Sequence, residues 1–425
     1  MLQSLCSVKN DGQSKLAVHQ HRSSVTCGEK MLTQLRPVLA FLGGLVVFGC
    51  IPSFCQTIEF DDGTVGVAKF HDPVSSDGLP QVSPLAADVN AAAPVGAAFF
   101  QKLFLSLGSK LIPMTILGSD PSLGAGTTVI PVVIVPVRFV FPDPGNPVLD
   151  GTARVTEVQN SPIFQNAEYS AGGISLGVTQ YGDAVQRAQF WNYPGFSQND
   201  YHVLLASPVV APTVTAVVPS TGCGASRTAS CGTATLSSRG ALAGRLDSSF
   251  FASVINPLVG NYPANVLVIF QTDNVFLYSG VPTNCCTIGF HNSEAPPIAT
   301  AHTWIFHAYT EPNTFTGDAI LDVQVLSHEV AEWLNDPFIS TISVVNLVAP
   351  YVLPGQEGAC QINFETGDVL EEPPVVFTKS VMGTTYHLQD EAFLPYFLHG
   401  PSFSVNGWYT FLNSFPTAST LCGPG

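Results

Sequence analysis

Hydrophobic residues occur mostly in short blocks along the chain, separated by turn-forming Gly, Pro, Ser and Asn. The clearest block, at 127–141, reads Thr-Thr-Val-Ile-Pro-Val-Val-Ile-Val-Pro-Val-Arg-Phe-Val-Phe. Its β-branched residues predict a buried strand, with the prolines at bulges or edges. Similar but shorter blocks predict strands at 201–206, 266–270 and 299–309.

One longer block has the spacing of a helix that is apolar on nearly every side. It covers 318–335, with Asp318 as a start signal and Pro337 as a stop signal. Shorter helices are expected at 97–107, 152–166, 182–191, 247–258 and 388–398. The Ser/Thr/Gly/Val-rich stretch 207–240 is typical of a hairpin or an insertion.

These elements predict an α+β domain over 126–425 that is β-rich and has long loops. Residues 57–125 are rich in Ala, Pro and Gly and show little periodicity, so we expect a low-order segment there. The remaining residues, 1–56, have a different character and are considered separately. No internal repeat is present.

The N-terminal part has the pattern of an export signal. A short positive start at Met31 is followed by an apolar run at 38–49 and by small residues before Gln56. We therefore expect 1–56 to be an upstream extension plus a signal peptide, with Met31 as the true start. The alternative is an uncleaved anchor, although the apolar run is short for a membrane span. Export predicts a secreted, periplasmic or cell-surface protein without a stable span after cleavage.

Composition narrows the classes of partner. The formal net charge is −16, and only 11% of the residues are charged. Because Lys and Arg do not cluster beyond the first forty residues or so, nucleic-acid binding is not expected. Neither a Gly-x-Ser-x-Gly elbow nor a phosphate-binding loop is present, so serine-nucleophile chemistry has no support.

Cysteine usage agrees with export. Beyond the expected cleavage point the chain has an even number of cysteines, as in disulfide-bonded exported proteins: Cys223, Cys231, Cys285, Cys286, Cys360 and Cys422. The first two bracket a short loop and are expected to pair. Adjacent cysteines rarely pair with each other, so we expect Cys285 and Cys286 to reach Cys360 and Cys422. A cysteine-based zinc site is disfavoured because no Cys-x-x-Cys spacing occurs.

The chemistry concentrates on the apolar helix at 318–335. His328, Glu329 and Glu332 lie in its second half, and glutamate is rarely buried unless it is paired or bound to a metal. His328 and Glu332 are four residues apart, so both side chains project from one face and can bind one ion. Glu329 then occupies the place of the general base in a His-Glu-x-x-His zinc helix. Glu332 replaces the second histidine, which lowers the positive charge at the metal and should make bound water less acidic.

The segment 328–337, His-Glu-Val-Ala-Glu-Trp-Leu-Asn-Asp-Pro, resembles the His-Glu-x-x-Glu-x-x-x-Asp-Pro metal helix of secreted, largely uncharacterised zincin-like proteins of soil bacteria. The stretches 285–291, 358–368 and 386–397 fit the same family, and the resemblance covers about 126–415. It implies a zincin-like mixed sheet with a central metal-binding helix. It also implies a metal-dependent hydrolase that uses zinc.

An open catalytic zinc site needs a third protein ligand. Glu365 is the first candidate, because the third carboxylate of thermolysin-like zincins also lies downstream of the metal helix. Glu357 and Asp336 are the alternatives, and Asp368 is a candidate for orienting a ligand. His302 and His307 lie on the strand expected before the helix, and one of them could approach the metal, but such residues are more often hydrogen-bonded core or surface histidines. His291 is ambiguous in the same way.

We therefore expect a zinc metallopeptidase that acts on a peptide or protein substrate. His328, Glu332 and Glu365 would hold the metal, and Glu329 would be the general base. One alternative is a non-catalytic extracellular protein in which the same carboxylates hold a structural ion, with calcium as a candidate. The other is a cell-surface or matrix-binding module with a degenerate site.

Overall fold

The computed structural model describes residues 56–70, 99–106, 110–224, 227–294, 301–339, 346–354, 360–372 and 374–422. All of them belong to one compact unit, Ser53–Gly425. The expectations for the extension, for the start at Met31 and for the signal peptide fall outside the described residues. Within these ranges no helix has both the length and the apolar character that a membrane crossing requires.

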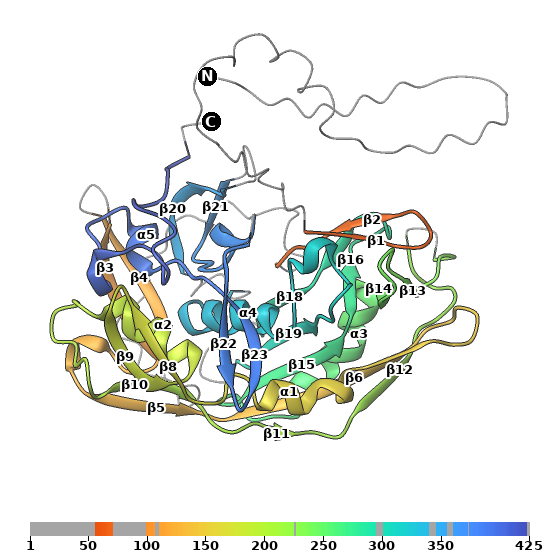
Figure 1. Ribbon diagram of the computed structural model, residues 1–425, viewed down its shortest axis with the longest axis horizontal. Coiled ribbons are helices and arrows are strands. Elements are labelled where there is room, and N and C mark those ends of the chain that lie inside the picture. Colours follow the sequence, from red (N-terminus) through yellow and green to blue (C-terminus); the bar gives the residue numbers. More distant parts are fainter. Residues whose placement is uncertain are drawn as a thin grey trace, which may run out of the picture. The chain divides into compact units, whose positions relative to one another are not determined.

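A mixed sheet with seven strands forms the centre of this unit (Figure 1). Its main path runs β11–β6–β15–β19–β18, and β7 and β12 also pair with β6. Neighbours on the path are parallel except β18, which is antiparallel to β19 at one edge. The strands are β6 (Val132–Val140), β7 (Val148–Asp150), β11 (Val209–Val210), β12 (Val214–Val217), β15 (Leu267–Asp273), β18 (Gly289–Ser293) and β19 (Thr303–Tyr309).

Both faces of this sheet are buried. In β15, Leu267 and Ile269 belong to one hydrophobic cluster, whereas Val268 and Phe270 belong to another. The first cluster includes residues of helices α1 (Val155–Gln159), α2 (Tyr181–Phe190) and α4 (Gln324–Asn335), and the second includes residues of α3 (Ser248–Val259). Burial on two faces explains why these strands are continuous hydrophobic runs rather than alternating ones.

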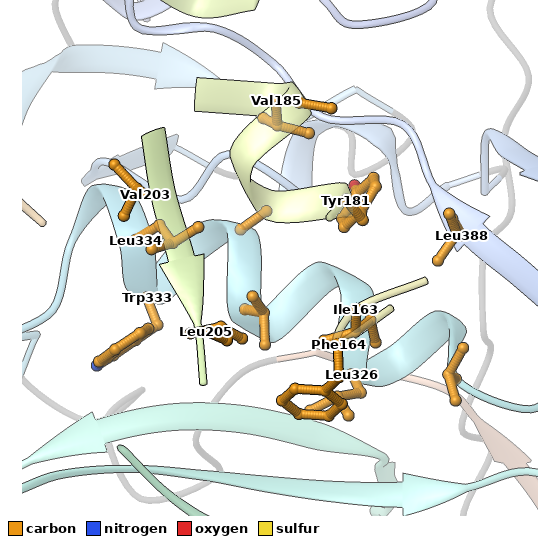
Figure 2. Close-up of a cluster of buried hydrophobic side chains, with 14 of the residues drawn as sticks. Ile163, Phe164, Tyr181, Val185, Val203, Leu205, Leu326, Trp333, Leu334 and Leu388 are labelled. Atoms are coloured by element: carbon orange, nitrogen blue, oxygen red, sulfur yellow. The ribbon is translucent and has the colours of Figure 1, made fainter. Parts of the chain in front are cut away.

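Helix α4 is buried along its whole length, as its sequence predicts. Leu326, Trp333 and Leu334 pack in the first cluster together with Tyr181 of α2 and Val203 of β10 (Figure 2). Helix α4 also contacts β18, β19, β23 and β4. The helix that carries the candidate chemistry is therefore fixed from several sides.

Smaller sheets surround this centre. A four-stranded sheet contains β13 (Gly232–Leu236), β14 (Leu242–Asp247), β16 (Val275–Tyr278) and β17 (Cys285–Thr287). The two-stranded pairs are β1 (Thr57–Glu59) with β2 (Val65–Val67), β3 (Phe99–Ser106) with β4 (Lys110–Leu117), β5 (Gly126–Ile130) with β10 (Tyr201–Leu205), β8 (Ala167–Ala171) with β9 (Ile174–Thr179), β20 (Leu347–Val352) with β21 (Cys360–Asn363), and β22 (Val376–Val381) with β23 (Thr384–Gln389). Helix α5 (Leu394–Leu398) and the 3-10 turns η2 (Pro121–Leu123), η3 (Gly151–Arg154), η5 (Thr316–Asp318), η6 (Asp368–Leu370) and η7 (Val405–Gly407) complete the described elements.

The predicted α+β class is confirmed, and so are most strands and helices. Strands β10, β15 and β19 and helices α2 and α3 occupy the predicted places. The α3 prediction rested on a polar start signal, and the Asp247 side chain accepts hydrogen bonds from the Ser249 and Phe250 backbone amides. The predicted strand at 127–141 is two strands, because Pro131 separates β5 from β6.

Several element predictions were wrong. The helix expected at 97–107 is strand β3, which pairs along its length with β4. Together with β1 and β2, these strands also replace the low order expected in the described part of 57–125. The helix predicted at 152–166 ends at Gln159, and the helix predicted at 388–398 begins only at Leu394, after strand β23.

The helix expected to bind metal also begins later than predicted. Helix α4 starts at Gln324 rather than at Asp318, because the residues before it do not continue a helix. Gly317, Asp318 and Asp322 all have positive φ values, of 66°, 53° and 42°, which a right-handed helix does not accept. The predicted end of the helix, at Asn335 before Asp336 and Pro337, is confirmed.

Three disulfides occur among the described residues. Cys223 pairs with Cys231 as predicted. The pairing predicted for the other four was wrong, since Cys285 pairs with Cys286 and Cys360 pairs with Cys422. The Cα atoms of Cys360 and Cys422 lie 6.2 Å apart, because β20 and β21 bring the two segments together and leave the adjacent pair to each other.

Shortening a buried leucine of α4 tests how far the fold depends on this helix. We predict that Leu326→Ala lowers the free energy of unfolding by about 2–5 kcal/mol, because it leaves a cavity in the main cluster. The measurement is urea unfolding followed by circular dichroism. Val178→Ala is the control, since this strand residue is 68% exposed, and it should cost less than about 1 kcal/mol. Equal losses in the two variants would contradict the prediction.

Candidate metal centre

Ionisable side chains from three separate segments meet beside α4. Helix α4 contributes His328, Glu329 and Glu332, strand β18 contributes His291, and the turn after β21 contributes Glu365 and Asp368. All are at most 4% exposed. Two sets of three possible ligands have atoms within 4.8 Å of one another: His328, Glu329, Glu332 and His291, Glu332, Glu365. Glu332 belongs to both sets and is therefore the centre of the cluster.

The Glu332 carboxylate is held in one orientation by backbone amides. Its Oε1 accepts hydrogen bonds from Gly367 N at 2.9 Å and from Asp368 N at 3.3 Å. Its Oε2 lies 3.0 Å from His328 Nε2 and 3.6 Å from His291 Nδ1. The turn after β21 thus binds one oxygen and leaves the other between two histidines.

His291 is oriented by its far ring nitrogen. Its Nε2 lies 3.0 Å from the backbone carbonyl of Asp336, at the end of α4, and can donate a proton there. A donating Nε2–H leaves the lone pair of Nδ1 for the cluster, where Glu329 Oε2 lies at 3.5 Å. Histidines that bind metals commonly have their second nitrogen fixed in this way.

His328 is held between two flat surfaces. The Phe70 ring stacks on its imidazole with a centroid distance of 4.3 Å. On another side lies Gly367, where an added Cβ would stand 2.3 Å from His328 Nδ1. With Nδ1 against the glycine, Nε2 points into the cluster, where Asp368 Oδ1 lies at 3.7 Å.

Further hydrogen bonds fix the turn that contains Gly367. Gln389, at the end of β23, donates from its side chain to the Gly367 carbonyl at 2.8 Å, and its backbone N–H donates to Ser327 Oγ of α4 at 3.0 Å. Gln361 donates to Asp368 Oδ2 at 2.9 Å. The turn and the helix are therefore joined through one strand, and the cluster geometry is part of the packed fold.

The cluster contains more buried negative charge than its histidines can neutralise. The buried carboxyl groups in and around it include Glu329, Glu332, Asp336, Glu365, Asp368, Glu371 and Glu391. Burial raises the pKa of Glu329, Asp336 and Asp368 to about 7, although the neighbouring histidines act in the opposite direction. Burial likewise raises the pKa values of Glu365 and Glu391 well above the usual range. Burial opposes ionisation of Glu332 too, but His328 and His291 lower its pKa to about 2.

These donors fit a divalent cation. Atoms that bind one tetrahedral zinc ion at about 2.1 Å lie about 3.4 Å apart. The distances around His328 Nε2 are close to that value, at 3.0 Å to Glu332 Oε2 and 3.7 Å to Asp368 Oδ1. So are the separate distances around His291 Nδ1, at 3.6 Å to Glu332 Oε2 and 3.5 Å to Glu329 Oε2. Four buried carboxylate oxygens have no hydrogen-bond donor among the described residues: both oxygens of Glu329, Glu365 Oε2 and Asp368 Oδ1. Buried acceptors without donors are costly, and a cation would compensate them.

The structure brings together most of the residues that the sequence singles out. His328, Glu329 and Glu332 lie together, and Glu365 lies with Glu332 and His291. Asp368 lies beside His328 and accepts from Gln361. The Asp336 carboxylate instead accepts from the Asn346 backbone amide at 3.3 Å, and its carbonyl faces His291. Glu357, the other alternative, falls outside the described residues.

Sequence reasoning missed two members of the cluster. It left His291 ambiguous between a metal ligand and an ordinary core or surface histidine, and it did not single out Glu391, whose carboxylate accepts from Thr366 Oγ1 at 3.0 Å. The available signal for His291 was its place in the stretch 285–291 that carries the resemblance. Of the other histidines considered, His302 pairs with Glu294 and His307 is buried in β19, where burial lowers its pKa to about 3.

No protein-family model, curated protein or solved structure matches this chain. The function is therefore argued from the geometry of the cluster.

The contact between Gly367 and His328 allows a direct test of the cluster geometry. We predict that Gly367→Ala weakens zinc binding by about tenfold or more, because the new Cβ displaces the imidazole. The measurement is a competition titration against a chromogenic chelator. Gly260→Ala is the matched control, since a Cβ there meets nothing within 4 Å, and it should bind zinc like the wild type. Wild-type affinity in Gly367→Ala would show that the ring does not bind the ion.

Buried carboxyl groups also predict a pH dependence of stability in the metal-free protein. A carboxyl group whose pKa is raised on folding stabilises the fold while it is protonated. This stability is lost as the pH rises from the pKa of the group in the unfolded chain to its pKa in the folded protein. For Asp368 that window runs from 3.8 to about 7. In the presence of a chelator, the melting temperature should therefore fall between pH 5 and pH 8, and zinc should reduce the fall. A melting temperature that rises with pH under chelation would contradict this prediction, and Asp368→Asn should flatten the profile.

Proposed function

We propose that this chain is a zinc-dependent hydrolase of the zincin type that cleaves peptide bonds. The observation that carries the proposal is Glu329. It lies beside the metal-binding pair on a buried helix, neither of its oxygens has a hydrogen-bond donor among the described residues, and its pKa is raised to about 7. A general base works best when its pKa lies near the working pH.

His328 and Glu332 would hold the metal in this proposal. Asp368 is the best placed third ligand, because its Oδ1 lies 3.7 Å from His328 Nε2. Glu365, the first candidate from the sequence, instead groups with His291 and Glu332. A histidine among carboxylates favours zinc over calcium, which prefers a shell of oxygen atoms. When bound, zinc acts as a Lewis acid and makes water a better nucleophile near neutral pH.

Glu329 would accept the proton of the attacking water and pass it to the leaving amine. Its Oε2 lies 3.5 Å from His291 Nδ1, so His291 is placed to orient the base. Gly289 allows the close approach of strand β18 to this carboxylate, because a Cβ there would stand 2.7 Å from Glu329 Oε1. The mixed sheet with a central helix that bears the metal-binding residues supports the zincin type.

We also infer that the protein is exported. The three disulfides within the described ranges support this inference, since disulfides persist mainly in oxidising compartments such as the periplasm and the extracellular space. The substrate class, a peptide or protein, rests on the resemblance to zincin-like proteins.

One observation favours a different function, a structural metal site. His328 and Glu329 are completely buried, and the Phe70 ring covers His328. Structural metal sites are closed by their ligands and by the surrounding protein, whereas catalytic sites keep one position open to substrate. In that case zinc would stabilise an extracellular protein that has no hydrolytic activity.

Replacing the base separates the two functions. We predict that Glu329→Gln retains zinc, measured by elemental analysis, and lowers peptide hydrolysis by at least about a hundredfold. The assay is cleavage of a mixed peptide library followed by mass spectrometry. Glu168→Gln, on strand β8 away from the cluster, should keep both zinc and activity. Chelation should abolish wild-type hydrolysis, and added zinc should restore it.

The structural-site alternative predicts a different set of results. Zinc would bind and raise the melting temperature, while neither the wild type nor Glu329→Gln would cleave any peptide. Hydrolysis that survives in Glu329→Gln would contradict the role of Glu329, and a wild type without zinc would contradict both functions.

A further inference from the structure

We propose that the cluster binds two metal ions, bridged by the Glu332 carboxylate, with His291 and Glu365 holding the second ion. This second site deepens the proposed function and rests on the metal binding that the function assumes, but not on hydrolysis. The proposal starts from the two sets of possible ligands, which share only Glu332.

Glu332 Oε2 has a histidine on two sides. His328 Nε2 lies at 3.0 Å and His291 Nδ1 at 3.6 Å, but the two histidines do not belong to a common set of ligand atoms within 4.8 Å. Two atoms that bind one ion at about 2.1 Å are at most about 4.2 Å apart. One ion can therefore bind either His328 or His291 in this arrangement, but not both. Two ions, one on each side of Glu332 Oε2, would bind one histidine each.

The second site has its own orienting contact. His291 Nε2 faces the Asp336 carbonyl at 3.0 Å, which directs Nδ1 toward Glu332. Glu365 offers a ligand oxygen within 4.8 Å of both His291 and Glu332, and its Oε2 lies 3.9 Å from the imidazole at Nε2. This oxygen is buried and has no hydrogen-bond donor among the described residues. The same is true of Asp336 Oδ2. Unpartnered buried oxygens on the His291 side are the acceptors that a second cation needs.

The charge of the cluster points the same way. Glu329, Glu332, Glu365 and Asp368 find their ion-pair partners among the described residues in histidines and not in lysine or arginine. One divalent ion balances two carboxylates, and two ions balance four. Two ions thus neutralise these four groups while both histidines are uncharged, which is the state in which imidazole binds metal.

Glu332 has the hydrogen bonds that a bridging ligand requires. Gly367 N and Asp368 N bind its Oε1, so Oε2 is left to both ions. Ions that share a ligand in this way lie about 3.5–4 Å apart in two-metal hydrolases, where they act together on the attacking and leaving groups. Glu329 belongs to the same set as His328, and its Oε2 lies 3.5 Å from His291 Nδ1, so this carboxylate would be close to both sites.

The test is the zinc stoichiometry of the full exported chain, measured by elemental analysis and native mass spectrometry after dialysis with zinc. We expect two zinc ions in the wild type and one in both His291→Ala and Glu365→Gln. His302→Ala is the matched control, since this histidine pairs with Glu294, and it should keep two. X-ray absorption of the loaded wild type should show zinc–zinc scattering at about 3.5–4 Å.

Each other outcome overturns the second site. A wild type with one zinc ion and normal Glu329-dependent hydrolysis leaves the proposed function intact and removes the bridge. A wild type without zinc removes both. If folded Glu365→Gln and His291→Ala each still bind two ions, these residues do not hold the second ion. Glu365→Gln is nearly isosteric, so it still tests the site if His291→Ala fails to fold.

Discussion

The burial of the Glu332 carboxylate is the constraint on which the rest of the site depends. A carboxylate inside a protein is costly unless donors or cations surround it. Here two backbone amides of the turn after β21 bind Oε1, and His328 and His291 flank Oε2. Three segments that are distant in the sequence therefore meet at this one side chain. Each is positioned so that the buried carboxylate receives a hydrogen bond or lies next to a histidine.

The hydrophobic core makes that meeting rigid. Helix α4 is apolar on the sides that face α2 and the central sheet, so it cannot rotate without exposing Leu326, Trp333 or Leu334. Edge strand β18 lies against the same helix and presents His291. Gln389 of β23 joins the Gly367 turn to Ser327 of α4. The directions of these candidate ligands are thus fixed by packing and by hydrogen bonds around them, as tight metal binding would require.

The sequence predicted the features that depend on local spacing, and it missed those that depend on tertiary contacts. The burial of α4 and the common face of His328 and Glu332 follow from helical spacing alone. His291 was missed because the approach of a strand histidine to a helix depends on the sheet order, which no spacing rule reports. The late start of α4 and the strand β3 were missed for related reasons. Left-handed residues such as Asp322 leave little trace in an apolar pattern, and pairing with β4 overrides the helical spacing of 97–107.

The same geometry explains why this chain has Glu332 where a His-Glu-x-x-His helix has its second histidine. A histidine at 332 would offer one lone pair from its ligating nitrogen, and its other nitrogen could not accept two backbone N–H groups. A carboxylate has two oxygens with several acceptor positions, so Glu332 can receive Gly367 N and Asp368 N and still face both His328 and His291. The glutamate is therefore matched to the turn and to strand β18, and a histidine there would leave two buried amides without acceptors.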